Sequence, residues 1–347
     1  MKKFKKQNLI KPLMLVFMFV SLLSSCSDEE ENDMVSSGPP VIESVSRAEE
    51  GDLEPITIGY ANNMYIIQGS GFASVEKIYF NDTDTYFNPA LVTDNTIFVT
   101  IDQNTPYENA SSILKVVTAK GTVTYQFVVA PPAPQVTRGF QPVNANEGDQ
   151  VTIYGNFFLD PIVTFGSIEA TIVSNTLTEI VAIVPAGAQN KYLTVTTISG
   201  ESSWGTAVGT SIYDDNFYGA WDIPAWNNHE YLTDPENAYQ GETFIHKEIS
   251  GFDNIQSEWI WDDQISAYTG VRFAVKSDTP GTLIFLFNGN YWGDETRAFD
   301  TTTEWQVVSY SWEELGGMPD GVQNISFQEF SGESHNYYFD DFSYTVD

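Results

Sequence analysis

Cysteine is nearly absent from this sequence, since Cys26 is the only one among 347 residues. No intrachain disulfide can form, so stability must come from packed cores, and a hydrophobic content of 42% is enough to build them. Basic residues are also scarce: 15 Lys and Arg face 47 Asp and Glu, giving a formal net charge of −32. Nucleic acid, anionic membrane surfaces and strongly acidic polysaccharides carry the same sign of charge, so a neutral partner is the simplest expectation.

Recognisable catalytic signatures are missing as well. The sequence has no G-x-S-x-G elbow and no phosphate-binding loop, and His229, His246 and His335 lack the H-x-x-x-H spacing of a zinc site. Residues 50–54 fit the E-x-D-x-E spelling of one β-glucanase family, whose carboxylates act as nucleophile and acid. However, this segment precedes the first repeat and has no tryptophan nearby, so we treat the match as chance. The chain is not expected to be an enzyme.

The first 25 residues have the pattern of an export signal. Four lysines stand within the first six residues, and a short apolar run, 13–20, follows. That run is too short to span a bilayer comfortably and is typical of a signal peptide. It leads to Leu23-Ser24-Ser25-Cys26, which resembles a bacterial lipobox and implies lipidation at Cys26. The alternative is an ordinary cleavage site with a chance cysteine.

Residues 26–37 are expected to be a lipidated cysteine followed by an acidic linker. The linker opens with Ser-Asp-Glu-Glu-Glu-Asn-Asp, and its simplest role is that of a solvated tether. It also resembles the acidic stretch that directs some Gram-negative lipoproteins to the exterior face of the outer membrane. The leader holds five lysines and no acidic residue, so its removal takes the formal charge from −32 to −37.

Two repeats of short strands follow, at 38–131 and 132–210. Each begins at a proline cluster, and Gln150–Phe158 parallels Ile66–Phe72 about 85 residues earlier. Short β-branched and aromatic runs between turn residues predict β-sandwiches. Both repeats resemble immunoglobulin-like IPT/TIG domains, through the proline start, the G-x-x-F turn and the Phe-Gly or Phe-Asn turn. The resemblance implies a spacer or interaction module without chemistry of its own.

Residues 211–347 form a third region, which holds seven of the eight tryptophans and only four Lys and Arg. Its strand signals continue without any convincing helical period, which suggests a jelly-roll β-sandwich. The ending Tyr338–Tyr344, together with the strand at Trp305, resembles the close of many carbohydrate-binding jelly rolls. The fold class predicted for the chain is therefore all-β, with tandem immunoglobulin-like (IPT/TIG) sandwiches before a jelly roll.

Exposed aromatic rings are the candidate binding groups, because a pyranose presents an apolar C–H face that stacks on a ring. Trp259 and Trp261 alternate around Ile260, so one face of a strand would carry both. Tyr291 and Trp292 stand in a Gly- and Asn-rich loop, where burying two adjacent rings is awkward. The predicted glycan-binding residues are Trp259, Trp261, Asn288, Asn290, Tyr291 and Trp292.

The remaining tryptophans are weaker candidates. Trp221 and Trp226 flank Pro224 in a loop and could be either bound to a ligand or packed. Trp305 and Trp312 lie among periodic apolar residues and are predicted to be core, as is Trp204 at a domain junction.

Asp214 and Asp340 are candidate metal ligands near the two ends of the jelly roll. In similar sugar-binding domains the first and last strands hold a structural calcium through carboxylate and carbonyl oxygens. Solvated or turn-forming acids are the alternative, and no cofactor is required.

The whole layout resembles the surface glycan-binding lipoproteins of polysaccharide utilisation systems. That resemblance implies capture of a neutral polysaccharide or oligosaccharide at the cell outer membrane, for a surface glycanase and a TonB-dependent importer. Extended neutral chains suit a flat aromatic platform, so a β-glucan (mixed-linkage, β-1,3 or xyloglucan) is the expected ligand. A surface glycoside hydrolase and a protein-binding adhesin remain the alternatives.

Overall fold

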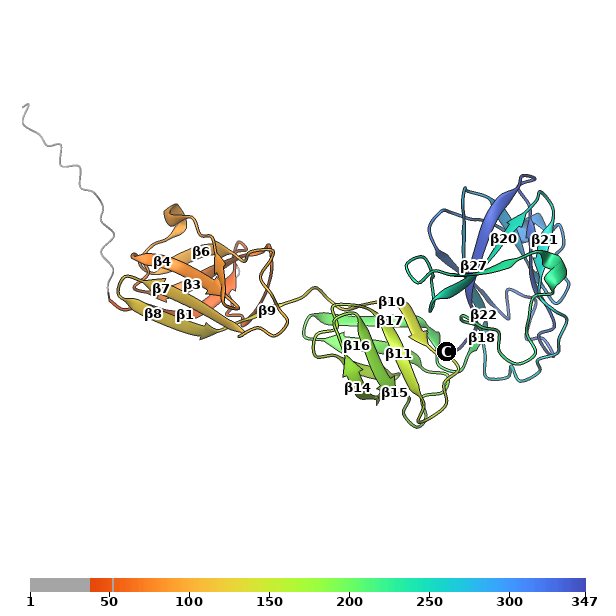
Figure 1. Ribbon diagram of the computed structural model, residues 1–347, viewed down its shortest axis with the longest axis horizontal. Coiled ribbons are helices and arrows are strands. Elements are labelled where there is room, and N and C mark those ends of the chain that lie inside the picture. The colour runs from red at the N-terminus through yellow and green to blue at the C-terminus, as the bar shows by residue number, and fades with distance from the viewer. Residues whose placement is uncertain (1–37, 52) are drawn as a thin grey trace, which may run out of the picture.

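The computed structural model describes residues 38–51 and 53–347, so the predicted leader, Cys26 and the acidic linker lie outside the described residues. Three β-sandwiches follow one another along the chain (Figure 1). The all-β prediction is confirmed, since the described part of the chain forms strands and only three short 3-10 turns: η1 (Pro89–Leu91), η2 (Ala225–Asn227) and η3 (Glu295–Arg297). In that same part, no helix has the length and apolar character needed to cross a membrane.

The first sandwich packs the sheet β1–β3–β6 on the sheet β5–β4–β7–β8, with a parallel pair, β2–β9, at its side. Its core is a single cluster of aliphatic and aromatic side chains from both sheets. The strands are β1 (Val41–Arg47), β2 (Ile58–Tyr60), β3 (Met64–Ser70), β4 (Val75–Phe80), β5 (Thr83–Thr85), β6 (Thr96–Thr100), β7 (Ile113–Thr118), β8 (Gly121–Gln126) and β9 (Val128–Ala130).

The second sandwich repeats this topology. Its sheets have the orders β10–β11–β15–β14 and β13–β12–β16–β17, which match the two main sheets of the first sandwich apart from the added β14; in the described residues the β2–β9 pair has no counterpart here. The repeat predicted from the sequence is therefore a repeat of structure. The strands are β10 (Gln135–Gln141), β11 (Gln150–Asn156), β12 (Ile162–Phe165), β13 (Ile168–Glu169), β14 (Thr171–Asn175), β15 (Glu179–Ile183), β16 (Tyr192–Thr197) and β17 (Gly200–Ala207).

The G-x-x-F motif has the same physical basis in both repeats. A side chain on Gly69 would overlap the carbonyl oxygen of Val41 and the ring of Phe72. One on Gly155 would likewise overlap the first strand of its own sandwich and the ring of Phe158. Both rings are fully buried. Glycine therefore lets the first strand pass close over the turn while the phenylalanine fills the core.

The third sandwich packs a sheet of order β19–β20–β27–β22–β25, with β18 paired to β27, on a sheet of order β21–β26–β23–β24. Apolar side chains alternate inward along the strands of both sheets and meet in one core. The strands are β18 (Ser211–Tyr213), β19 (Glu230–Thr233), β20 (Thr243–Ile249), β21 (Asn254–Gln256), β22 (Gly270–Ser277), β23 (Thr282–Phe287), β24 (Ala298–Asp300), β25 (Gln306–Ser311), β26 (Ile325–Glu329) and β27 (His335–Thr345).

A buried ion pair of the third sandwich lies at its junction with the second sandwich. Arg272 on β22 contacts Asp341 on β27 at 2.9 Å, with side chains only 6% and 0% exposed. The hydroxyl of Thr206, from the second sandwich, donates to the same carboxylate at 2.8 Å. A side chain on Gly205 would overlap the guanidinium, so glycine lets the two domains approach.

Hydrogen bonds extend this junction in both directions. Gln240 Nε2 donates to the carbonyl oxygen of Phe140 at 2.7 Å, and Arg138 Nη1 donates to that of Gly241 at 2.8 Å. One bond is donated by the third domain and the other by the second, so hydrogen bonds join the two domains directly.

The link between the first and second sandwiches is thinner. β9 ends at Ala130 and β10 begins at Gln135, with Pro131-Pro132-Ala133-Pro134 between them, and Figure 1 shows this link as a single extended segment. A hydrogen bond from Ser199 Oγ to the carbonyl oxygen of Pro131, at 2.7 Å, holds its start. Proline restricts φ, so such a link is stiff but has few lateral contacts.

Candidate functional site

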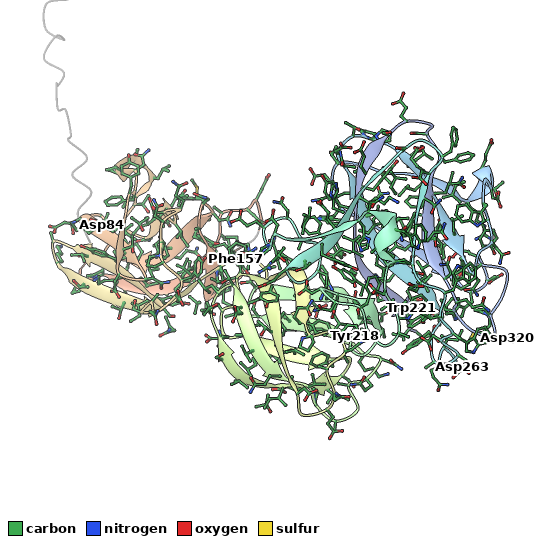
Figure 2. All side chains as sticks on the ribbon, turned by 45° about the vertical axis from the view of Figure 1, so that its right-hand side comes forward. Asp84, Phe157, Tyr218, Trp221, Asp263 and Asp320 are labelled. Carbon is green, nitrogen blue, oxygen red and sulfur yellow. The ribbon has the colours of Figure 1, made fainter. Side chains whose placement is uncertain are left out.

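Three segments meet at one end of the third domain: 257–263, 288–294 and 316–324. Backbone hydrogen bonds join them, from Ile260 N to Gln323 O at 2.9 Å and from Asn288 N to Asn324 O at 2.9 Å. Figure 2 shows Asp263 and Asp320 close together at this end of the domain. We call this region the tryptophan end, because Trp259, Trp261 and Trp292 lie on it.

Trp259 and Trp261 do not lie in a strand, contrary to the prediction, because their segment pairs irregularly with 322–325 beyond the end of β21. The predicted alternation nevertheless holds. Ile260 packs against the core, while Trp259 and Trp261 are 59% and 54% exposed. The two rings therefore lie on the same, outward side of the segment.

Glycines allow both rings to rest on backbone. A Cβ on Gly289 would lie 2.5 Å from the Trp259 ring, and one on Gly321 would lie 3.0 Å from the Trp261 ring. Each ring thus has one edge supported by a neighbouring loop while more than half of its surface faces solvent. The loop at 288–294 and Trp259 are neighbours in space, as a shared binding surface requires.

Tyr291 and Trp292, adjacent in sequence, have different environments. Trp292 is 45% exposed. Tyr291 is half-buried against the core, its hydroxyl donates to Leu315 O at 2.8 Å, and the Arg297 guanidinium lies 4.1 Å from its ring centroid. The hydroxyl of Tyr291 is therefore engaged and a cation lies over its ring, so Tyr291 supports the loop that presents Trp292, and its role as a stacking ring stays a prediction.

Asn288 is also a supporting residue rather than a free polar group. Its Oδ1 accepts from Gln323 N at 2.7 Å, and its Nδ2 donates to Gly321 O at 2.9 Å. These bonds tie the 288–294 loop to the segment beneath Trp261. Asn290 is exposed and is the predicted amide that remains on the surface.

Gln323 is a polar group that the sequence did not single out. Its backbone carbonyl accepts from Ile260 N, which places the residue between Trp259 and Trp261 along the chain pairing, and its side chain is half-buried. An amide beside exposed rings can donate to and accept from sugar hydroxyls. Nothing in the local sequence marks Gln323, because only the pairing with 259–261 brings it there.

The charge of the tryptophan end is acidic. Asp262 and Asp263 follow the tryptophan pair, and Asp294 closes the loop, where its carboxylate accepts from Thr296 N and Thr296 Oγ1. These two bonds hold the pKa of Asp294 below its usual range. A negative surface repels an anionic polymer, so a neutral ligand fits this end best.

A second group of rings lies on the opposite sheet, on the outer face of β19–β20–β27–β22–β25, which we call the junction face. The rings contact one another in a chain that starts at Trp204 of the second domain. Their centroid distances are 5.0 Å for Trp204–Tyr239, 6.1 Å for Tyr239–Trp305, 5.8 Å for Trp305–Phe244, 5.9 Å for Phe244–Tyr338 and 5.0 Å for Tyr338–His246.

Trp305 belongs to this face and is half-buried, so the prediction that it is core was wrong. Its indole N–H donates to Asn237 O at 2.8 Å, and Lys276 Nζ lies 4.6 Å from its ring centroid. Trp305 directly precedes β25, the edge strand of the sheet. Apolar residues on such a strand predict burial, but every second side chain of a strand faces away from the core. Trp312 and Trp204 are buried as predicted, and Trp221 is buried as well.

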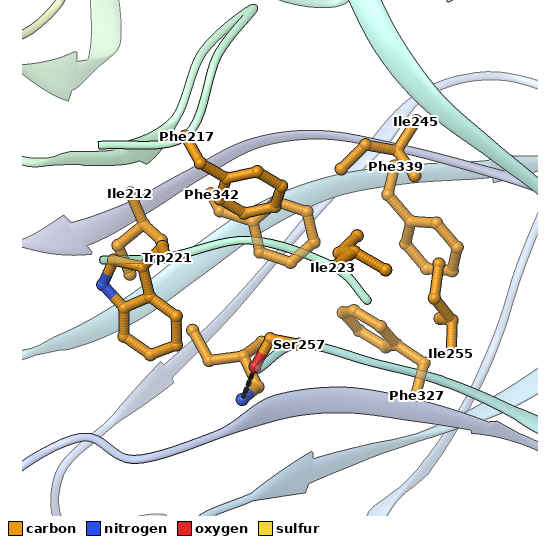
Figure 3. Close-up of a pocket in the computed structure, with 11 residues that line it drawn as sticks. Ile212, Phe217, Trp221, Ile223, Ile245, Ile255, Ser257, Phe327, Phe339 and Phe342 are labelled. Carbon is orange, nitrogen blue, oxygen red and sulfur yellow. Dashed lines mark hydrogen bonds between the residues drawn. The ribbon is translucent and has the colours of Figure 1, made fainter. Parts of the chain in front are cut away.

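The core of the third domain contains an apolar cavity between the sheets (Figure 3). Ile212, Trp221, Ile223 and Phe342 are among its lining residues, and Ser257 is the polar one. The Ser257 hydroxyl already accepts from Ile325 N at 3.0 Å and donates to Glu258 O at 3.0 Å. A sugar needs several polar partners, so this cavity is a packing feature and not the glycan site.

Asp214 and Asp340, the predicted calcium ligands, lie at the junction between the second and third domains. Asp214 Oδ2 accepts from Val143 N at 2.8 Å, and Asp340 Oδ2 accepts from Gln240 N at 2.9 Å. Burial raises the pKa of Asp214 to about 7 and raises the pKa of Asp340 well above its ordinary value.

These two residues do not fit a calcium site. Calcium takes about six to eight oxygen ligands, whereas these oxygens accept from N–H groups. Within 38–51 and 53–347, no set of three or more His, Cys, Asp and Glu side chains is placed to hold a metal ion. The two carboxylates instead bind the backbone at the domain junction.

Residues 134–213 match the model of the IPT/TIG domain family, in agreement with the resemblance predicted for the second repeat. An IPT/TIG domain-containing protein of Bacteroides ovatus is 24% identical over 189 residues, which are 53% of this chain and 37% of that protein. The chain thus matches little more than a third of that relative's length.

Similar solved structures include a surface glycan-binding protein from Prevotella bryantii, 14% identical, covering 90% of this chain and 100% of that chain with a TM-score of 0.49. A protein described as SGBP-B, from a complex xyloglucan utilization locus in Bacteroides uniformis, is 14% identical over 89% and 99%, with a TM-score of 0.34. A family 11 carbohydrate-binding module from Clostridium thermocellum, in complex with a β-1,3-1,4-mixed-linked tetrasaccharide, is 11% identical over 37% and 85%, with a TM-score of 0.26. Identities and TM-scores this low do not assign a function to this chain.

Proposed function

We propose that this chain is a non-catalytic protein that binds a neutral polysaccharide on its tryptophan end. The observation that carries the proposal is the set of three tryptophans, Trp259, Trp261 and Trp292, which are about half exposed and lie on two of the three segments that hydrogen bonds fix together. Large exposed rings are costly to keep in water unless a ligand uses them. Their support by Gly289, Gly321 and Asn288 pre-organises them for a ligand.

The chemistry of the surface suits an extended glycan. Ring faces stack on the apolar face of a pyranose, and the amides of Asn290 and Gln323 can hydrogen-bond to hydroxyls. The acidic surroundings disfavour a uronic acid polymer. Exposed rings spread over two segments can contact successive sugars along an extended chain, so we propose a β-glucan (mixed-linkage, β-1,3 or xyloglucan) as the ligand.

We also propose where the protein works. Acylation of Cys26 would anchor the chain in the outer membrane, since several acyl chains on one residue give stable attachment. The acidic linker would hold the sandwiches outside the cell, where a captured polysaccharide could pass to a surface glycanase and a TonB-dependent importer. Replacement Cys26→Ala should release the protein from the outer membrane in cell fractionation, and full retention there would contradict the anchor.

The experiment for binding uses the chain from Ser27 onward in affinity gels that contain mixed-linkage β-glucan, β-1,3-glucan, xyloglucan or a uronic acid polymer. We expect retardation by at least one neutral glucan and none by the acidic polymer. A Trp259→Ala, Trp292→Ala double variant should lose the retardation, whereas Tyr86→Ala, which removes an exposed ring of the first domain, should keep it. Retardation that survives the double variant would place the site elsewhere.

The same material separates binding from catalysis. Size-exclusion profiles of a bound glucan should be unchanged after long incubation with the protein. Shortened glucan would make the chain a glycoside hydrolase. Failure to bind any glycan, with retention of a protein partner, would make it an adhesin.

A further inference from the structure

Trp226 lies outside the tryptophan end as defined above, yet it is the most exposed of the tryptophans named here, at 60%. It stands in the middle of η2, and its neighbour Asn227 is buried. Because Asn227 is buried, the backbone that carries the exposed Trp226 ring is held in place, unlike that of a mobile loop tip. Its position therefore needs a physical reason.

Asn227 fixes this ring to the edge of a sheet. Its Nδ2 donates to Gln256 O at 3.0 Å, and its Oδ1 accepts from Gln256 N at 2.9 Å. The side-chain amide thus replaces a neighbouring strand at β21, which is the edge strand of its sheet. A further backbone bond, from Glu258 N to Asp222 O at 2.8 Å, holds the start of the same loop.

The edge strand β21 lies beside Asn227, the neighbour of Trp226, and the chain runs on from β21 to Trp259. Ile255 and Ile260 pack in the core, whereas Gln256 is half-exposed and Trp259 is exposed. Trp259 follows Gln256 by three positions, which extended chain spans in at most about 10 Å. The exposed rings at 226 and 259 thus border one edge of the same sheet.

We propose that Trp226 is a second stacking position, which extends the glycan site along β21 so that it binds a longer stretch of a neutral polysaccharide. This inference rests on the proposed function. Gln256 lies between the two ring positions, and its Nε2 donates to Asn254 Oδ1 at 2.6 Å, which leaves its carbonyl side for a sugar hydroxyl. The exposed Glu258 beside it disfavours an acidic chain here too.

The test uses oligosaccharides of increasing length, prepared from the neutral glucan that the wild-type chain binds, with affinity measured by calorimetry. Trp226→Ala should leave the affinity for the shortest bound oligosaccharide unchanged and weaken that for the longest about fivefold to tenfold. Trp292→Ala should weaken binding at every length. Trp226→Phe should restore most of the lost affinity, and Tyr86→Ala should change nothing.

Two results would overturn the inference in distinguishable ways. If Trp226→Ala binds every length as the wild type does, while Trp292→Ala is impaired, the site ends at Trp259 and the proposed function stands. If the wild-type chain binds no glycan of any length, the proposed function fails and takes this extension with it. Melting temperatures of the variants should equal the wild-type value, which separates lost contacts from lost folding.

Discussion

The tryptophan end and the junction face are both rich in aromatic rings, but the rings are used differently. On the tryptophan end, Trp259 and Trp261 each have one edge against a neighbouring loop, and these two rings and Trp292 leave about half of their surface to solvent. On the junction face the rings contact one another, and the ammonium of Lys276 lies over Trp305 at 4.6 Å and over Tyr338 at 5.5 Å. Composition alone does not distinguish a binding ring from a structural ring; the occupancy of its faces does.

The largest expected effect concerns the buried pair behind the junction face. Arg272→Ala should lower the free energy of unfolding by about 3–5 kcal/mol, because it leaves the Asp341 carboxylate buried without its cation. Denaturant unfolding of the chain from Ser27 onward measures this loss. Arg297→Ala is the matched control, since that arginine stacks on Tyr291 and pairs with no buried acid in the described residues.

If Arg272→Ala unfolds like the control, the junction does not depend on its ion pair. The folded fraction of either variant should still bind glycan in the affinity gel. Loss of binding in Arg272→Ala under native conditions would mean that the junction face also contributes to glycan binding.

The second prediction compares the removal of one ring from each region. Trp292→Ala should weaken glycan binding at least tenfold, or about 1.4 kcal/mol, with no change in melting temperature. Trp305→Ala should do the reverse: binding stays, and the free energy of unfolding falls by about 2 kcal/mol through the lost contacts with Phe244 and Tyr239. Calorimetry and thermal melts on the same preparations decide, and an exchanged result would mean that the two regions have exchanged roles.

The tryptophan pattern also shows how far sequence reasoning reaches. The side on which Trp259 and Trp261 lie was predictable, because alternation around a core residue survives even where the strand is irregular. The burial of Tyr291 beside the exposed Trp292 was not, because it depends on Leu315 and Arg297, which only the fold brings to the ring.

The fold itself was more accessible than the site. Proline clusters and the paired G-x-x-F turns predicted the repeat, since close strand passage demands glycine there. Asp214 and Asp340 were attributed to calcium because acidic pairs at strand ends fit such a site by type. Their partners are Val143 N, which comes from the second domain, and Gln240 N, which is 100 residues away in the third, and no local pattern encodes either contact.

The third effect is a dependence on pH that arises at the junction. Burial raises the folded-state pKa of Asp214 to about 7, above its ordinary value near 4, so the folded state holds this proton more tightly than the unfolded state. Stability from this group is full below about pH 4 and is lost as pH rises toward 7. Between pH 5 and pH 7 the loss should be about 1–2 kcal/mol.

Asp214→Asn provides the measurement, because it removes the titration while keeping the shape. Its unfolding free energy should decline less than that of the wild type from pH 5 to pH 7. Equal slopes would assign the pH dependence to other groups at the junction, of which Asp340 and Asp341 also have raised pKa values through burial. Glycan binding should show no matching change, since Asp214 is remote from the tryptophan end.

The smallest effect concerns the cation on the junction face. Lys276→Met keeps most of the unbranched apolar side chain and removes the ammonium, so it should cost about 0.5–1 kcal/mol of stability through the lost cation–π contacts. Lys276→Arg should retain most of that energy. Tighter glycan binding by Lys276→Met would show that the lysine had been covering a ring available to sugar, and the two regions would then be alike.

The proline link between the first two sandwiches determines how many independent motions the chain has. Hydrogen bonds join the second and third domains directly, so we expect these two to move as one body relative to the first domain. The tryptophan end therefore keeps a fixed orientation relative to the second domain, and the stiff proline link limits how far the two domains can turn relative to the first. A ligand bound at the tryptophan end would restrict the motion of this one two-domain body and not of two separate domains. The orientational entropy lost on binding would therefore be small.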